Sequence, residues 1–182
     1  MSDRRSAGIL IIALFFLSLI ITLIGDRDLF FYWRVKTSKA FRDSQIAEII
    51  KTLNFYNKVL IDFYASDGKP FLLNKFPGSI MLRHHTFRDI GFLQAHNRVI
   101  VYDMAEVIPV NIEITGPTTA TAIVLERWNY IYQKRQDRSL VSSIKGMGRG
   151  FKYYMLRVVD HWIIQDYEPV DVEEPPIKEF RF

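Results

Sequence analysis

The stretch IPVNIEITGPTTATAIVLERWNYIYQ, residues 108–133, decides the fold. Its first part alternates between apolar and other side chains, which is the period-two pattern of a half-buried strand. The apolar members are Ile108, Val110, Ile112 and Ile114. Gly116-Pro117 predicts a turn, and the β-branched and aromatic run over 119–133 predicts a second, longer strand. We therefore expect an antiparallel hairpin here.

Further strands are predicted on both sides of this hairpin. They cover residues 99–104, 151–159 and 162–167, with Asp160-His161 as a tight turn between the last two. From residue 105 onward the chain is expected to form a four-stranded antiparallel meander. A sheet of this kind needs a helix or a second layer over one of its faces.

A long helix that can supply this cover is predicted over residues 37–65. Its apolar residues recur at spacings of three and four and so form one stripe: Ile46, Ile49, Ile50, Leu53, Tyr56, Leu60, Phe63 and Tyr64. Thr37 or Ser38 can cap its start, and the run SDGKP over 66–70 ends it. A short second helix is predicted over 86–96. The expected fold class is α+β, with a long helix packed on a curved antiparallel meander.

Ahead of this domain, residues 7–25 form an uncharged apolar run, AGILIIALFFLSLIITLIG. As a helix at ~1.5 Å per residue it is roughly 28 Å long, which matches the hydrocarbon thickness of a bilayer. The run is longer than the core of a cleavable signal peptide, and no Ala-x-Ala site follows it. We predict one uncleaved transmembrane helix. One stripe along it can contact other spans: Ile9, Ile12, Phe16, Leu19 and Leu23.

The charges on either side of this run predict its orientation in the membrane. Arg4 and Arg5 precede it, whereas two acids and one arginine follow at 26–28. By the positive-inside rule, residues 1–6 form a cytoplasmic stub and the rest of the chain lies outside the cytoplasm. The expected location is a bacterial inner membrane, with the carboxyl-terminal domain in the periplasm.

A juxtamembrane segment, residues 26–43, joins the span to the domain. It contains an aromatic cluster of Phe30, Phe31, Tyr32 and Trp33. Such rings form a belt at the membrane interface, and the basic residues that follow can pair with anionic headgroups. The alternative is that the four rings begin a packed helix. We expect an interfacial belt.

Composition and charge narrow the classes of function. The chain has no cysteine, which excludes disulfides, thiolate metal sites and a cysteine nucleophile. Residues 26–167 carry 20 Lys and Arg against 14 Asp and Glu, while the tail, 168–182, carries 2 against 5. This balance favours an acidic protein partner or anionic lipid. Nucleic acid is not expected, because the sequence has no dense basic helix or known nucleic-acid motif.

Two segments are candidate partner contacts. The first is a predicted solvated loop over 134–150, which has one acid, Asp137, and five basic residues: Lys134, Arg135, Arg138, Lys145 and Arg149. The glycines at 146–150 lead into a strand, so they predict a hairpin loop rather than a phosphate-binding loop. The second is the acidic, proline-containing tail, expected to be extended, with Ile177, Phe180 and Phe182 as anchors. The alternative for this tail is a disordered end without a partner.

The histidines are the candidates for catalysis or metal binding. His84, His85 and His96 lie in one segment with Asp89, and His161 follows Asp160. A His and Asp pair can act as general acid and base. However, adjacent histidines point in different directions, and the spacing matches no metal motif. We therefore predict no catalytic residue, no metal site and no cofactor.

Helices followed by a meander that ends in a DHWII strand resemble the SnoaL-like cone of the nuclear transport factor superfamily. The residues that carry this resemblance are 112–122, as strand, turn and strand, and Trp162-Ile163-Ile164 as the final strand. The resemblance covers the domain, residues 44–167. With a single span ahead of a periplasmic cone, the architecture is also similar to the inner-membrane core component of type IV secretion systems.

These features predict a non-catalytic accessory or scaffolding subunit of an inner-membrane complex. Its partners would be membrane lipid and other subunits of that complex. An alternative is a membrane-anchored protein that binds a lipid or a hydrophobic small molecule in the pocket of the cone. A third hypothesis is a cone-fold enzyme that works through His and Asp.

Overall fold

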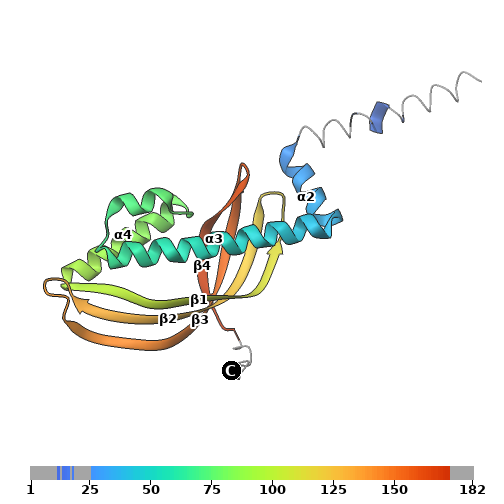
Figure 1. Cartoon of the computed structure of the whole chain (residues 1–182). Coiled ribbons are helices and arrows are strands. Elements are labelled where there is room, and N and C mark those ends of the chain that lie inside the picture. The colour runs from blue at the N-terminus through green and yellow to red at the C-terminus, as the bar shows by residue number, and fades with distance from the viewer. Residues whose placement is uncertain (1–11, 13, 17, 19–25, 173–182) are drawn as a thin grey trace, which may run out of the picture.

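The structure is a computed structural model that describes residues 12, 14–16, 18 and 26–172. Helices come first and strands follow, as predicted (Figure 1). The helices are α2 (Arg27–Thr37), α3 (Lys39–Ala65), the 3-10 helix η1 (Pro70–Lys75) and α4 (Ile80–Ala95). The strands are β1 (Arg98–Ile114), β2 (Thr119–Lys134), β3 (Leu140–Val158) and β4 (His161–Val170).

The four strands form one sheet in the order β1-β2-β3-β4, and each neighbouring pair is antiparallel. This is the predicted meander. The sheet is strongly curved, and α3 lies along one of its faces (Figure 1). The predicted stripe of α3 supplies the core there, where Ile49, Leu53 and Phe63 are fully buried. The α+β class with a long helix on a curved antiparallel sheet is therefore confirmed.

Short polar residues set the helix boundaries. The carboxylate of Asp26 caps α2 by accepting from two backbone N–H groups of the first turn. Ser38 ends α2 through its own N–H and caps α3 by accepting from the N–H of Phe41. The predicted helix start at 37–38 thus marks a junction between two helices. After α3, Asp67 and Gly68 have left-handed backbone conformations and end the helix as expected.

Two predicted strands, 99–104 and 108–114, are one continuous strand, β1. Ala105 and Glu106 lie between the two predicted strands, yet both residues pair with β2. Register shifts at 102–104 and 109–111 absorb the irregularity. Pro109 is tolerated because β1 is an edge strand.

The predicted loop over 134–150 is largely strand. The turn is confined to 135–139, and β3 begins at Leu140. Gly146 has a positive φ of 66° and lies at a register shift between β2 and β3. There its N–H donates to the side chain of Asn129 at 2.8 Å. The glycine thus provides a bulge within the hairpin rather than a flexible loop.

The second helix, α4, starts at Ile80 and so is longer than the predicted 86–96, because Ser79 caps it. The predicted transmembrane helix lies mostly outside the described residues. Ile12 and Phe16 of its stripe are helical and exposed, whereas Ile9, Leu19 and Leu23 are not described. Among the residues that the structure describes, no helix is long and apolar enough to cross a membrane.

Candidate functional site

The aromatic cluster after the predicted span forms part of α2. Phe30 and Trp33 are exposed, and their rings stack with centroids 5.9 Å apart. Phe31 instead lies in the core, among aromatic rings of α3 and β4. This ring therefore fits the alternative of a packed helix and not the predicted belt, because its burial leaves nothing for lipid to contact. Membrane contact by Phe30, Tyr32 and Trp33 stays a prediction.

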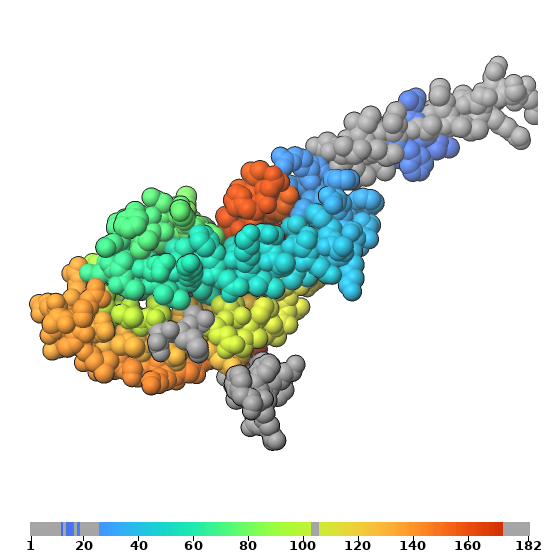
Figure 2. Space-filling view, in the orientation of Figure 1, coloured from blue at the N-terminus to red at the C-terminus, as the bar shows by residue number. Residues whose placement is uncertain are grey.

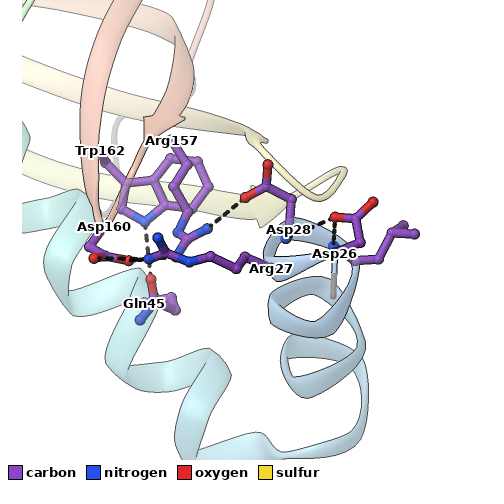
Figure 3. Close-up of polar contacts among 8 residues, drawn as sticks. Asp26, Arg27, Asp28, Gln45, Arg157, Asp160 and Trp162 are labelled. Atoms are coloured by element: carbon purple, nitrogen blue, oxygen red, sulfur yellow. Dashed lines mark hydrogen bonds and ion pairs between the residues drawn. The ribbon is translucent and has the colours of Figure 1, made fainter. Parts of the chain in front are cut away.

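A network of ion pairs fixes α2 to the turn between β3 and β4 (Figure 3). The Arg157 guanidinium lies 3.1 Å from Asp28 of α2 and 3.4 Å from Asp160. Arg27 pairs with the same Asp160 at 3.0 Å. The side chain of Arg157 is only 10% exposed, and its guanidinium lies 3.8 Å from the centroid of the Phe31 ring. One mostly buried cation thus joins the helix next to the predicted span to the sheet.

At the same end of the sheet, Trp162 joins β4 to helix α3. Its indole N–H donates to the side-chain oxygen of Gln45 on α3 at 3.2 Å (Figure 3). On the other side of α2, the hydroxyl of Tyr32 donates to the carbonyl of Thr115 in the β1–β2 turn at 3.4 Å. Helix α2 is therefore attached to both turns at this end of the sheet.

The turn of the β2–β3 hairpin lies at the opposite end of the domain from α2 (Figures 1 and 2). Of the five basic residues predicted as partner contacts, three lie at or beside this turn, Lys134, Arg135 and Arg138, whereas Lys145 and Arg149 lie farther along β3. All five are exposed. Arg135 pairs with Asp67 in the turn after α3, so this residue helps to hold the hairpin against the helices. The Arg149 guanidinium lies 5.6 Å from the ring centroid of Phe151. Two hydrogen bonds from Ser139 hold the pKa of the Asp137 carboxyl below its usual value.

Among the described residues, the outer half of β3, residues 140–149, has a neighbouring strand on one side only and so forms a sheet edge. On one side it pairs with β2, but β4 pairs only with 150–158. Every residue of this half is exposed, including four large apolar ones: Leu140, Val141, Ile144 and Met147. An unpaired edge of this length is a template for another strand. We refer to residues 140–149 as the β3 edge.

A cavity of about 140 Å³ lies between the carboxyl-terminal half of α3 and the sheet. Besides the hydroxyl groups of tyrosines, two polar side chains line it, Asn57 of α3 and Glu126 of β2. Most of the remaining lining consists of aromatic rings, among them those of Tyr56, Tyr102, Trp128, Tyr130, Tyr153 and Tyr167. Among the described residues, no lysine, arginine or histidine lines this cavity.

Glu126 contributes a carboxyl group to the lining of this cavity, and its side chain is buried, with an exposed fraction of only 3%. Its Oε1 accepts from the Asn57 amide at 3.1 Å and from the Tyr153 hydroxyl at 2.5 Å. Its Oε2 accepts from the indole N–H of Trp128 at 2.9 Å. Burial raises the pKa of the Glu126 carboxyl, although the three hydrogen bonds act in the opposite direction. The Oδ1 of Asn57 is buried and has no hydrogen-bond partner.

The phenols around Glu126 remain neutral at any physiological pH. Burial raises the pKa of Tyr130 to about 12 and also raises those of Tyr102 and Tyr153 well above their usual value. The ring of Tyr102 lies 5.0 Å from that of Trp128 and 5.2 Å from that of Tyr130, centroid to centroid. These contacts produce a continuous aromatic wall on the sheet side of the cavity.

The cavity is smaller than pockets for drug-sized molecules, which measure about 300–1,000 Å³. A lipid or hydrophobic small molecule as its ligand stays a prediction. Sequence reasoning missed Glu126, although a signal was present. Val124, Glu126 and Trp128 occupy alternate positions of one strand and so share a face. An acid between two large apolar residues on the inward face indicates a buried polar site.

The histidines do not take part in this cavity. His84 and His85 are exposed on α4, and His161 is exposed at the start of β4. His96 is also exposed and lies at the carboxyl end of α4, where its Nδ1 is 2.8 Å from the carbonyl oxygen of Phe92. Asp89 accepts instead from the hydroxyl of Tyr64. Within the described part of the chain, no group of three or more His, Asp or Glu is placed to hold a metal ion.

No family model matches the chain, and no curated protein sequence matches it. Its fold is similar to that in the crystal structure of the intermembrane space region of chloroplast protein ARC6, with a TM-score of 0.54 and 11% sequence identity. The match covers 67% of this chain and 93% of that region. At this identity the likeness concerns the fold alone. It supports an α+β sheet domain, while the resemblances to the SnoaL-like cone and to the secretion component stay predictions.

Proposed function

We propose that the chain is a membrane-tethered, non-catalytic scaffolding subunit of a bacterial inner-membrane complex, with its folded domain in the periplasm. The observation that carries this proposal is the attachment of α2. Arg157 and the core ring of Phe31 fix this helix, which directly follows the predicted span, to the sheet. An enzyme that only has to be near a membrane can be joined to its anchor by a flexible linker. A scaffold, in contrast, has to hold its binding surface in a fixed position relative to the membrane.

Two further observations support a tethered domain. The described large apolar residues of the predicted span are helical and more than half exposed, so the domain does not cover them: Ile12, Leu14, Phe15 and Phe16. In addition, a region of ARC6 that lies in an intermembrane space has a similar fold. Both are in keeping with a domain held beside a membrane.

The partner-binding surface in this proposal is the β3 edge. Helix α3 has 27 residues and is about 40 Å long, and it separates the β2–β3 hairpin from α2 (Figure 1). At that distance from the helix next to the span, we favour an acidic protein over anionic headgroups. The occupant would be an extended acidic segment of another subunit. Its backbone would pair with the β3 edge and its carboxylates with Lys145 and Arg149.

A crosslinking experiment in native membranes tests this proposal. A photo-reactive residue at Ile144 should capture one acid-rich segment of one partner. Lys145→Glu combined with Arg149→Glu should abolish that adduct through charge repulsion. The matched control, Lys58→Glu with Arg88→Glu, reverses one exposed lysine and one exposed arginine on α3 and α4 and should leave the adduct intact.

Three results would contradict the scaffold. The first is a free 21.4 kDa species in mild detergent. The second is an adduct that survives charge reversal on the β3 edge as well as it survives the control. The third is protease digestion of spheroplasts that leaves the domain uncut. The predicted tail anchors, Ile177, Phe180 and Phe182, lie outside the described residues. Truncation after Val172 tests them and spares β4, which ends at Val170.

A further inference from the structure

Glu126 is a buried acid for which the described residues supply no cation. Its three hydrogen-bond donors, from Asn57, Tyr153 and Trp128, are all neutral. In the described part of the protein, no basic side chain lines the cavity beside it. Buried carboxylates in proteins are almost always paired with a positive group, because removing a lone charge from water is costly.

Next to this acid, a buried amide oxygen also has no hydrogen-bond partner. Asn57 is 3% exposed and lines the same cavity, yet its Oδ1 accepts no hydrogen bond. Turning the amide over would not help, since Oδ1 would then face Oε1 of Glu126, an acceptor against an acceptor. Oε2 of Glu126 accepts only from Trp128 and has capacity for another donor. Oδ1 of Asn57 therefore has no donor, and Oε2 of Glu126 can accept a further hydrogen bond.

The aromatic walls favour a donor that is positively charged. The faces of Trp and Tyr rings carry negative electrostatic potential and attract cations, most strongly where water is excluded. Tyr102, Trp128 and Tyr130 lie against one another on the sheet side, with centroids 5.0–6.0 Å apart. Tyr153 lies 6.0 Å from Tyr56 of α3 by the same measure.

We propose that this cavity binds a small primary alkylammonium ion. Its charge pairs with Glu126, its N–H groups donate to Glu126 and to the free oxygen of Asn57, and its alkyl part lies among the rings. Since one water occupies about 30 Å³ of liquid, a cavity of about 140 Å³ has room for one molecule the size of about four or five waters. Tyr130 and Tyr167 are partly exposed, so solvent reaches the lining from their side. The site is independent of the scaffolding role.

The test uses the full chain in a maltoside detergent, with n-propylammonium and propan-1-ol as a matched pair of probes. The two differ in carrying NH₃⁺ or OH on the same alkyl chain. Binding is followed by saturation-transfer difference NMR and by titration calorimetry. We expect saturable binding of one ammonium ion per chain, at least about tenfold tighter than that of the alcohol.

Two variants locate the site. Glu126→Gln keeps the shape of the side chain, removes its charge and should weaken ammonium binding at least about tenfold. Glu113→Gln makes the same change at an exposed position of β1 and should leave binding unchanged. No saturable ammonium binding, equal binding of the alcohol, or full binding by a folded Glu126→Gln protein would each overturn the proposal. If Glu126→Gln fails to fold, the comparison of n-propylammonium with propan-1-ol on the unaltered chain still decides whether the cavity selects an ammonium ion.

Discussion

Replacing Arg157 with alanine should detach α2 from the sheet at a cost of about 2 kcal/mol in the free energy of unfolding. The pairs with Asp28 and Asp160 contribute together roughly 0.2–1 kcal/mol, because both carboxylates are at least half exposed. The contact with the Phe31 ring adds about 0.5–2 kcal/mol, since this cation is mostly buried. Removing Arg157 leaves no lone buried charge, so no larger penalty is expected.

Arg27→Ala is the matched control. It deletes the same type of residue and one of the pairs with Asp160, but its side chain is 71% exposed. The expected loss is about 0–0.5 kcal/mol. For a chain of this length the Tm should fall by roughly 4–8 °C in Arg157→Ala and by about 2 °C or less in Arg27→Ala. Thermal and denaturant unfolding of the full chain in detergent measure both changes.

Hydrogen exchange tests where the change occurs. In Arg157→Ala the backbone amides of α2 should exchange faster, while those around Leu53 in the middle of α3 keep their protection. Equal destabilisation by the two substitutions would refute the assignment of Arg157 as the residue that holds α2. So would a loss below about 0.5 kcal/mol in Arg157→Ala.

Four further predictions concern the core, the sheet, helix α4 and the buried acid. Leu53→Ala removes a fully buried side chain from α3 and should lower the free energy of unfolding by about 2–5 kcal/mol in denaturant titrations. Gly150→Ala should destabilise by about 1–3 kcal/mol, because its Cβ would meet the last backbone carbonyl of β4. Gly91→Ala, with open space on an exposed part of α4, should stabilise by about 0.5–1 kcal/mol in the same assay. Burial raises the pKa of Glu126, so the stability that this group contributes is present at low pH and is lost as pH rises above about 4.5. The stability of Glu126→Gln relative to the unaltered chain should therefore increase with pH, and a constant difference across a pH series would contradict this.

The parts of the fold that bury one face were predictable from sequence. Helix α3 and strands β2 and β4 each place apolar residues at the period of their element, because one side faces the core and the other faces water. Ser38 was predictable as a cap for a related reason, since a short hydroxyl before an apolar stripe satisfies free N–H groups. These signals are local and need no knowledge of tertiary contacts.

The outer half of β3 lacks such a signal. Residues 140–149 are exposed on both faces, so no side chain there has to be apolar and no alternation appears. Gly146 and Gly148 also lower the strand propensity of the segment. The segment is a strand because β2, which is predictable, provides a long template for pairing. The role of Arg157 could not be predicted from sequence either, since its partners Asp28 and Asp160 are far from one another in sequence.

Glu126 illustrates a further limit of reading residues one at a time. By itself, a glutamate in a strand predicts an outward, solvated position. Its neighbours at two residues' distance, Val124 and Trp128, predict the opposite. Where the two indications conflict, burial of the neighbours decides, because turning the strand to expose the acid would also expose Val124 and Trp128. The strand keeps its apolar face inward, and the carboxyl group is buried with it. The carboxyl group then accepts three hydrogen bonds from neutral donors on α3, β2 and β3, which come together only after the chain has folded. A charged residue that contradicts the pattern of its own strand is therefore a better guide to a site than His84 and His85, whose exposed positions on α4 contradict nothing.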